Sequence, residues 1–420
     1  MKSFISERVK HTKQSVTLEL NEKVKQLEQQ GQTTYNLTAG QLSFRPPAAY
    51  IQSLSSQLNF LASYQYSPVA GFEALRERIL EHFFLDRTFM TGDARVDESL
   101  GESIRSEMGC IISNGSKHSL YNLLGCIIDP DDEVILFSPY WVSFPEMIKF
   151  WDGIPISVSG HLYDGFVPDL EQMKKVIGPR TKCIILNSPN NPTGVYYSKS
   201  WMKQFAAILE AHPNIFVISD EIYSQLFYYD PAPHYFYQFS PDLLKRTAIV
   251  QGISKTLAAT GLRLGYTIAP KNIIAAMSKL QGQTTSGPNS LVQLALVDFN
   301  DMELNSYLRE IRHHLRRNCE SLKETFRKLN LSPCWYQTNA AFYFLIDFMR
   351  TPYFKSKFPQ HTRDQDVSQM ICDDLFKQTN VAIVPGTNFG LANSARISLT
   401  LEWGPFDQAI QLLGEFLTKE

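Results

Sequence analysis

Between residues 110 and 269, short runs rich in β-branched residues alternate with stretches of helical periodicity, and this alternation limits the possible folds more than any other feature. Strands are expected over residues 110–113, 133–137, 154–158, 182–187, 215–219, 247–251 and 265–269, and helices over 71–84, 117–128, 169–177 and 199–212. Strands that are separated by helices pair in parallel through crossover connections. We therefore expect an α/β sheet with helices on both faces.

The regions outside this alternation predict a second, smaller unit. An amphipathic helix is expected over residues 16–30, and the polar segment 87–108 is expected to be a long loop or insertion. A long charged helix over 291–329 is followed by strands at 341–347 and 395–400, by a helix at 366–378 between them, and by a last helix. This pattern favours an N-terminal segment (1–49) that packs with a small α+β domain (296–420), and a large domain over 50–295.

Size, charge and cysteine content exclude several classes of function. A chain of 420 residues exceeds what one core usually supports, and a net charge of −2 argues against nucleic acid as the main partner. No window reaches eighteen consecutive apolar residues, so no membrane span is expected. The six cysteines are widely spaced and the N-terminus lacks an apolar signal core, which favours a cytoplasmic protein with reduced thiols and no structural zinc.

Polar residues with chemical potential follow the predicted strands, where ligands bind in open α/β sheets. They lie in NGSKHS (114–119), SPYW (138–141), SPNNPTG (188–194), SDEIY (219–223) and SKTLAATGLRLGY (254–266). Each has an ordinary structural explanation: a helix start, a core tryptophan, a tight turn, a helix cap, or solvated charges. These ordinary explanations do not account for all five motifs together. Five successive strands would each have to be followed by chance by a group that can bind an anion, stack on a ring or ionise.

Pyridoxal phosphate chemistry requires this combination of groups. It needs a lysine amine for the aldehyde, a carboxylate against the pyridine nitrogen, and a phenol and an amide near the ring oxygen. Helix N–H groups and a guanidinium suit the phosphate, and an aromatic residue covers the ring.

SPNNPTG, SDEIY and SKTLAATGLRLGY, in this order and spacing, resemble the fold-type I, class I aminotransferases. In particular, DDEVILFSPYWVSFPEM and VPGTNFG are similar to patterns of the bacterial aspartate aminotransferase subgroup, and the similarity runs from about residue 16 to the C-terminus. The resemblance implies a large, mostly parallel seven-stranded sheet, a smaller α+β domain, pyridoxal 5'-phosphate as cofactor, and a homodimer with shared active sites.

The resemblance also assigns roles by position. Lys255 matches the Schiff-base lysine, Asp220 the partner of the pyridine nitrogen, and Tyr223 with Asn191 the pair at the ring oxygen. The remaining cofactor positions are the helix start Gly115, Ser116 and Lys117, the phosphate clamp Arg263, the stacking ring Trp141, and Tyr66, which reaches the phosphate of the neighbouring subunit. For the substrate, Arg396 matches the arginine that grips the α-carboxylate, Gly40 matches a backbone contact to it, and Lys117 with Thr17 resembles the pair that recognises an acidic side chain.

Several positions depart from the subgroup's pattern and bear on substrate choice. The chain reads GQLSF where GEPDF is usual, Ala340 replaces a glycine, and Gly252 stands where a serine often contacts phosphate, so that Ser254 is a candidate to compensate. The predicted reaction is transfer of an amino group between an L-amino acid, aspartate or glutamate, and a 2-oxo acid by a ping-pong mechanism. Open alternatives are aromatic or neutral amino acids as substrates, a carbon–sulfur β-lyase, and a non-enzymatic pyridoxal-binding regulator.

Overall fold

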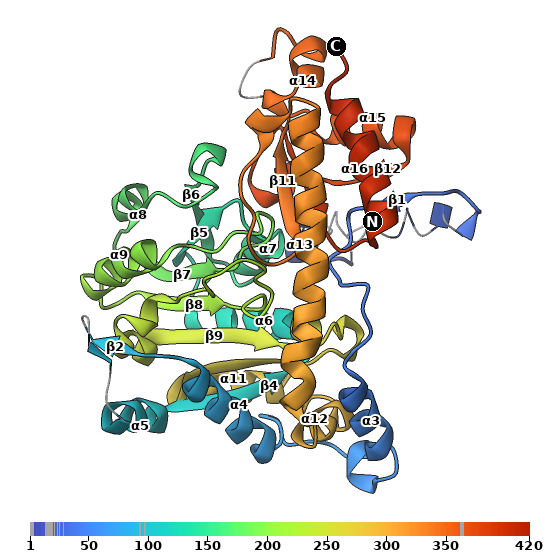
Figure 1. Ribbon diagram of the computed structural model, residues 1–420. Coiled ribbons are helices and arrows are strands. Elements are labelled where there is room, and N and C mark those ends of the chain that lie inside the picture. The colour runs from blue at the N-terminus through green and yellow to red at the C-terminus, as the bar shows by residue number, and fades with distance from the viewer. Residues whose placement is uncertain are drawn as a thin grey trace.

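The computed structural model describes residues 4–12, 20, 22, 24, 26–27, 29–91, 94–95, 98–361 and 365–420. A seven-stranded sheet forms the centre of the larger part of the molecule, in the order β4-β10-β9-β8-β7-β5-β6 (Figure 1). Its strands are β4 (Met108–Ser113), β5 (Glu133–Ser138), β6 (Ile154–Ser159), β7 (Thr181–Asn187), β8 (Phe216–Asp220), β9 (Thr247–Gly252) and β10 (Gly265–Pro270). Strand β10 is antiparallel to both of its neighbours, and the pairs from β9 to β6 are parallel. The predicted mostly parallel sheet is therefore confirmed.

Helices cover both faces of this sheet because its strands are apolar on both sides. Along β5, Val134 and Leu136 belong to one buried cluster, whereas Ile135 and Phe137 belong to the other. The first cluster is completed by α6 (Ser116–Ile127), α7 (Ser143–Phe150) and α11 (Lys271–Gly282). The second takes in α4 (Glu73–Asp86), α8 (Leu170–Val176), α9 (Lys199–Glu210) and α12 (Ser290–Val297).

A smaller α+β part stands beside one end of the sheet, and the long helix α13 (Leu304–Lys328) runs along both parts (Figure 1). The antiparallel sheet of this smaller part consists of β11 (Tyr343–Asp347), β14 (Ser394–Ser398) and β13 (Val384–Pro385), in that order. Strand β1 (Tyr35–Asn36) pairs in parallel with β12 (Val381–Ala382), so the N-terminal region contacts the C-terminal part. Further α-helices are α1 (Glu7–His11), α3 (Ala48–Gln57), α10 (Ile253–Thr256), α14 (Pro352–Lys357), α15 (Ser368–Thr379) and α16 (Trp403–Leu417). The division into domains at residues 49 and 295 stays a prediction.

The structure corrects two predicted elements. The helix expected over 291–329 is two helices, because α12 ends at Val297 and α13 starts only at Leu304. Segment 87–108 is not a long loop but holds β2 (Met90–Thr91), β3 (Ala94–Arg95) and α5 (Glu98–Glu107). The first part of the helix predicted over 16–30, including Thr17, lies outside the described residues. Among the described residues, no helix has both the length and the apolar character needed to cross a membrane.

Candidate active site

A cavity of about 370 Å³ lies beyond the carboxyl ends of β7 and β8, between the large sheet and the small part. This volume falls within the range of roughly 300–1,000 Å³ typical of small-molecule sites. The predicted site residues that line it are Gly40, Ser116, Lys117, Trp141, Asn191, Asp220, Tyr223, Lys255, Arg263 and Arg396. Residues from chain positions more than 350 apart thus meet in one cavity, as the polar residues after successive strands predicted.

Lys255 and Asp220 both line the cavity, where Asp220 is buried and Lys255 is partly buried. Lys255 lies on the short helix α10, directly after β9, and its Nζ donates to the carbonyl oxygen of Gly40. Burial lowers the pKa of Lys255 to about 7, and the nearby guanidinium groups of Arg396 and Arg263 act in the same direction. Burial also raises the pKa of Asp220, at the end of β8, to about 7. An amine with so low a pKa is neutral, and therefore nucleophilic, in a large fraction of molecules at physiological pH.

The shifted pKa of Asp220 predicts how Asp220→Asn changes the stability of the cofactor-free protein. Because the folded pKa is about 7 and the ordinary value is 3.8, the folded state binds more protons than the unfolded state between these pH values. The contribution of Asp220 to the free energy of unfolding therefore falls as pH rises through this window. At pH 8 the variant should be more stable than wild type by roughly 2–4 kcal/mol, since each pKa unit corresponds to about 1.4 kcal/mol. Urea unfolding at pH 5 and pH 8 measures the difference, and an equal gain at both pH values would contradict the assignment.

The N-terminus of α6 and Arg263 form a cationic corner of the cavity. Gly115 caps the helix with a positive φ of 86°, and a Cβ there would lie 2.4 Å from a guanidinium nitrogen of Arg263. Arg263 is fixed by donation to the carbonyl oxygens of Thr260 (2.9 Å) and Asn114 (3.4 Å). Free helix N–H groups beside a guanidinium are well suited to a phosphate.

Two glycines allow α6 to approach the sheet closely at this corner. Gly252 and Gly265 pair across β9 and β10, and a Cβ on Gly265 would lie 2.3 Å from the backbone nitrogen of Ser116. A Cβ on Gly252 would lie 2.8 Å from the Ser116 Oγ, which donates to the Gln251 carbonyl oxygen. The glycine found where the related pattern often has serine therefore has a packing reason. Ser254 is buried and lines the same cavity.

Loop 188–194 holds Asn191 through hydrogen bonds and close packing. The Asn191 backbone N–H donates to Asn187 Oδ1 (2.9 Å), and Asn187 Nδ2 donates to the carbonyl oxygen of Asp220 (3.0 Å). Gly194 has a φ of 69° and lies against the small part, where a Cβ would come within 2.2 Å of the Tyr343 carbonyl oxygen. The loop thus joins the large sheet to the small part and fixes the amide of Asn191 within the cavity.

Arg396 enters the cavity from β14 and is almost fully buried. Its NH1 donates to Asn191 Oδ1 (3.1 Å) and its NH2 donates to the Thr38 carbonyl oxygen (2.9 Å). Its Nε is buried and has no hydrogen-bond partner among the described residues. Because an unpaired buried donor is costly, this guanidinium is well prepared to bind an anionic ligand.

Lys117 and Trp141 form the outer wall. Lys117 Nζ lies 4.9 Å from the centre of the Trp141 ring, and burial together with Arg263 lowers the pKa of Lys117. Lys117 also lines an adjoining hollow of about 540 Å³, so it stands between the cavity and that outer space.

Among the described residues, the predicted Tyr66 lies apart from the cavity, 95% exposed at the surface near Pro288, and Gly115 caps α6 without lining the cavity. Thr17 is outside the described residues. The sequence reasoning missed Thr38 and Tyr343, which also line the cavity. Tyr343 belonged to a strand that was predicted, but strand periodicity does not tell which side chain reaches a distant site. Thr38 contributes a backbone oxygen, which no side-chain pattern can indicate.

Comparisons with known proteins agree with this geometry. The profile of the family "Aminotransferase class I and II" matches residues 32–411. The aspartate/prephenate aminotransferase of Thermus thermophilus is 33% identical over 398 residues, covering 94% of each chain. The aspartate aminotransferase of Geobacillus stearothermophilus is 32% identical over 416 residues, or 98% of each chain. The solved structure of aspartate aminotransferase from Thermus thermophilus with maleate has a TM-score of 0.84 at 32% identity, covering 99% of this chain and 100% of that one.

The chain therefore belongs to the class I and II aminotransferase family, whose members are pyridoxal phosphate enzymes. More particularly, it is a fold-type I aminotransferase of the aspartate aminotransferase subgroup and catalyses amino transfer between an amino acid and a 2-oxo acid. The family resemblance stated from the sequence is confirmed.

Proposed function

We propose that the cavity binds pyridoxal 5'-phosphate between Lys255 and Asp220, with the phosphate at the N-terminus of α6 and at Arg263. The observation that carries this proposal is the meeting of a partly buried amine, a buried carboxyl and a cationic helix start in one cavity of suitable size. The donor set fits the cofactor, because glycine at position 115 lets the Arg263 guanidinium lie directly against the start of α6, so that the cation and the free helix N–H groups can face the same phosphate. Trp141 supplies an aromatic face for the ring.

The bound cofactor would supply an aldehyde for the amino group and a ring that withdraws electrons from the substrate Cα. Around it, Lys255 takes the proton from Cα, since its low pKa makes the amine an effective base near neutral pH. Asp220 supplies negative charge to hold the ring nitrogen protonated. Tyr223 and the Asn191 amide donate to the ring oxygen, and Arg396 with the Gly40 backbone orients the α-carboxylate. These groups are in place before the substrate arrives, so little reorganisation is needed during proton transfer.

We infer that the amino donor is aspartate or glutamate and that two half-reactions follow each other in a ping-pong sequence. The cation of Lys117 at the mouth of the cavity is suited to a second carboxylate, and the similar proteins named above are aspartate and aspartate/prephenate aminotransferases. Thr17 is proposed as its partner on the basis of the sequence alone.

Replacing Lys117 by alanine tests the choice of donor. Lys117 is exposed at the mouth of the cavity, but a bound substrate would bury its pairing with a second carboxylate. Loss of one partner of such a pair costs about 2–5 kcal/mol, so kcat/KM for aspartate and glutamate should fall roughly 30- to 5,000-fold. Neutral and aromatic donors, assayed against 2-oxoglutarate, should change much less. Lys149→Ala is the control, because Lys149 borders the adjoining outer hollow and pairs with Glu146 at 3.4 Å, yet does not line the cavity. An equal loss for all donors in Lys117→Ala would assign Lys117 a cofactor role instead. A wild-type enzyme that accepted the amino group of alanine but not that of aspartate would contradict the proposal of an acidic donor.

We further propose a homodimer in which Tyr66 of one subunit completes the site of the other. Its support is a group of exposed apolar side chains around Tyr66, including Phe60, Leu61 and Tyr64, which a single chain leaves in contact with water. Cytoplasmic location is an expectation from the sequence.

Co-expression of two impaired subunits tests the shared site. Lys255→Ala and Tyr66→Ala dimers should each be strongly impaired, whereas a hybrid has one site that combines an intact Lys255 with an intact Tyr66. Random pairing should then restore about a quarter of wild-type activity, because half of the dimers carry one complete site. Co-expressed subunits whose activity is no higher than the mean of the Lys255→Ala and Tyr66→Ala homodimers would contradict the shared site.

A further inference from the structure

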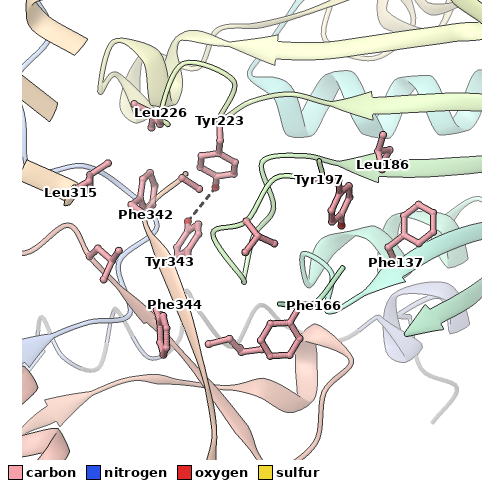
Figure 2. Packing of buried hydrophobic residues seen from close by; sticks show 14 of the residues in the cluster. Phe137, Phe166, Leu186, Tyr197, Tyr223, Leu226, Leu315, Phe342, Tyr343 and Phe344 are labelled. Carbon is pink, nitrogen blue, oxygen red and sulfur yellow. Dashed lines mark hydrogen bonds between the residues drawn. The ribbon is translucent and has the colours of Figure 1, made fainter. Parts of the chain in front are cut away.

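One phenol in the cavity wall has no role in the proposed function. Tyr343 is the first residue of β11 and is 1% exposed. Its hydroxyl oxygen lies 3.2 Å from that of Tyr223, and the two rings meet edge to face with 5.9 Å between their centres (Figure 2). In Figure 2 the two hydroxyl groups point toward each other between the apolar residues of the large and small parts.

The same residue also contacts Arg396. In the pairing of β11 with β14, Tyr343 stands opposite Ser398 and Leu345 opposite Arg396, which makes Tyr343 and Arg396 diagonal neighbours. The Arg396 Cζ lies 4.4 Å from the centre of the Tyr343 ring and 5.0 Å from that of Phe389. The guanidinium thus contacts two aromatic rings.

We propose that Tyr343 is a positioning residue for amino transfer: its hydroxyl donates a hydrogen bond to Tyr223, and its ring fixes the plane of the Arg396 guanidinium. The inference rests on the roles proposed above for Tyr223 and Arg396. It links the group expected at the cofactor ring oxygen with the group expected at the substrate carboxylate, through one side chain.

The direction of the hydrogen bond follows from counting protons. A phenol has one proton, and Tyr223 uses its own when it donates to the ring oxygen, so the bond between the two tyrosines needs the proton of Tyr343. Burial raises the pKa of both phenols, and the Arg396 guanidinium opposes the rise in each, so both hydroxyl groups keep their protons near neutral pH.

Tyr343 is itself firmly held, as a positioning residue must be. Its carbonyl oxygen lies 3.0 Å from Thr338 Oγ1, whose single hydroxyl proton is shared between this oxygen and the Gly194 carbonyl oxygen (2.8 Å) of the loop that carries Asn191. The start of β11 is therefore tied to the same loop that orients the Asn191 amide.

The hydroxyl and the ring have separable effects. Donation from Tyr343 polarises the Tyr223 hydroxyl and makes it a stronger donor, which favours negative charge on the ring oxygen it faces. Tyr343→Phe should therefore raise the pKa of the visible absorbance of the lysine-bound cofactor by roughly 0.3–1 unit, with little change in KM. Tyr343→Leu also removes the ring, so KM for every amino acid should rise about 3- to 30-fold, as expected for loss of a buried cation–π contact.

The experiment compares both variants with Tyr228→Phe and Tyr223→Phe in the cofactor-loaded enzyme. Tyr228 is a matched control because it is also buried and its hydroxyl bonds Thr338 Oγ1 at 3.1 Å, yet it does not line the cavity. We expect an unchanged absorbance pKa in Tyr228→Phe, a rise in Tyr343→Phe, and a larger rise in Tyr223→Phe. Thermal unfolding of the cofactor-free variants establishes that they are folded.

A Tyr343→Phe enzyme whose absorbance titrates as wild type would overturn the proposed hydrogen bond, and an unchanged KM in Tyr343→Leu would overturn the role of the ring. If either result were found together with a raised absorbance pKa in Tyr223→Phe, the role of Tyr343 would be refuted and the proposed function would stand. A Tyr223→Phe enzyme with unchanged pKa would instead refute the proposed role of Tyr223 itself.

Discussion

Replacing Lys255 by alanine is expected to lower kcat for every amino donor by at least about 10⁴-fold, because both the covalent attachment of the cofactor and the main proton acceptor are lost. The side chain of Lys255 lines the cavity, and its amine donates to the Gly40 carbonyl oxygen. Steady-state assays with aspartate and 2-oxoglutarate measure the loss, and the absorbance of the lysine-bound cofactor should disappear with it.

The matched control is Lys279→Ala on the exposed side of α11, which should behave as wild type. A small primary amine added to the Lys255→Ala enzyme should restore part of the activity, because the space vacated by the side chain admits it. Retention of more than about a hundredth of wild-type kcat in Lys255→Ala would exceed what loss of a general base permits and would contradict the role.

Replacing Arg396 by leucine is expected to lower kcat/KM roughly 10²- to 10⁴-fold for all amino acids and all 2-oxo acids. The substitution removes a buried cation that is held by Asn191 and by the Thr38 carbonyl oxygen, and it leaves both acceptors unpaired. Most of the loss should appear in KM, while the absorbance of the bound cofactor should remain. This uniform loss differs from the selective loss expected for Lys117→Ala.

Arg350→Leu is the control for a general effect of removing an arginine from the small part. Arg350 does not line the cavity, and it forms an ion pair of 3.1 Å with Asp347. If Arg396→Leu impaired only dicarboxylic substrates, Arg396 would bind the side-chain carboxylate rather than the α-carboxylate.

Much of the large sheet and most of the candidate site could be predicted from the sequence because both depend on local signals. Asp220 and Asn191 follow strands whose apolar runs are unambiguous, and the carboxyl ends of parallel strands must meet along one edge. The helix start at Gly115 and the tight turn that ends at Gly194 were also local signals, and both glycines adopt positive φ in the structure.

The errors have a different origin, since they depend on distant contacts. The predicted long helix is interrupted because Arg78, on α4, donates to the carbonyl oxygens of Leu296, Val297 and Phe299 and so satisfies the end of α12. Apolar residues recur across this break at Phe299 and Met302, and the cap residue Asn300 is a local sign of it that the prediction overlooked.

Segment 87–108 gains its structure in the same way. Arg87 forms an ion pair of 2.8 Å with Glu221, the buried residue next to Asp220, and Phe89 and Ile104 are buried. Glu221 lies more than a hundred residues from Arg87 in the chain, and the burial of Phe89 and Ile104 depends on packing. Neither can be read from the polar composition of the segment, which suggested a loop. Tyr343 was missed for the same reason: its importance comes from Tyr223 and Arg396, which only the fold brings to it.

The most direct test of the central claim is reduction of the purified, cofactor-loaded enzyme with borohydride, followed by digestion and mass spectrometry of its peptides. The account predicts one modified peptide, which carries a pyridoxyl phosphate group on Lys255 within ISKTLAATGLR. Modification of another lysine, or a fully active enzyme that carries no modified peptide after reduction, would contradict it.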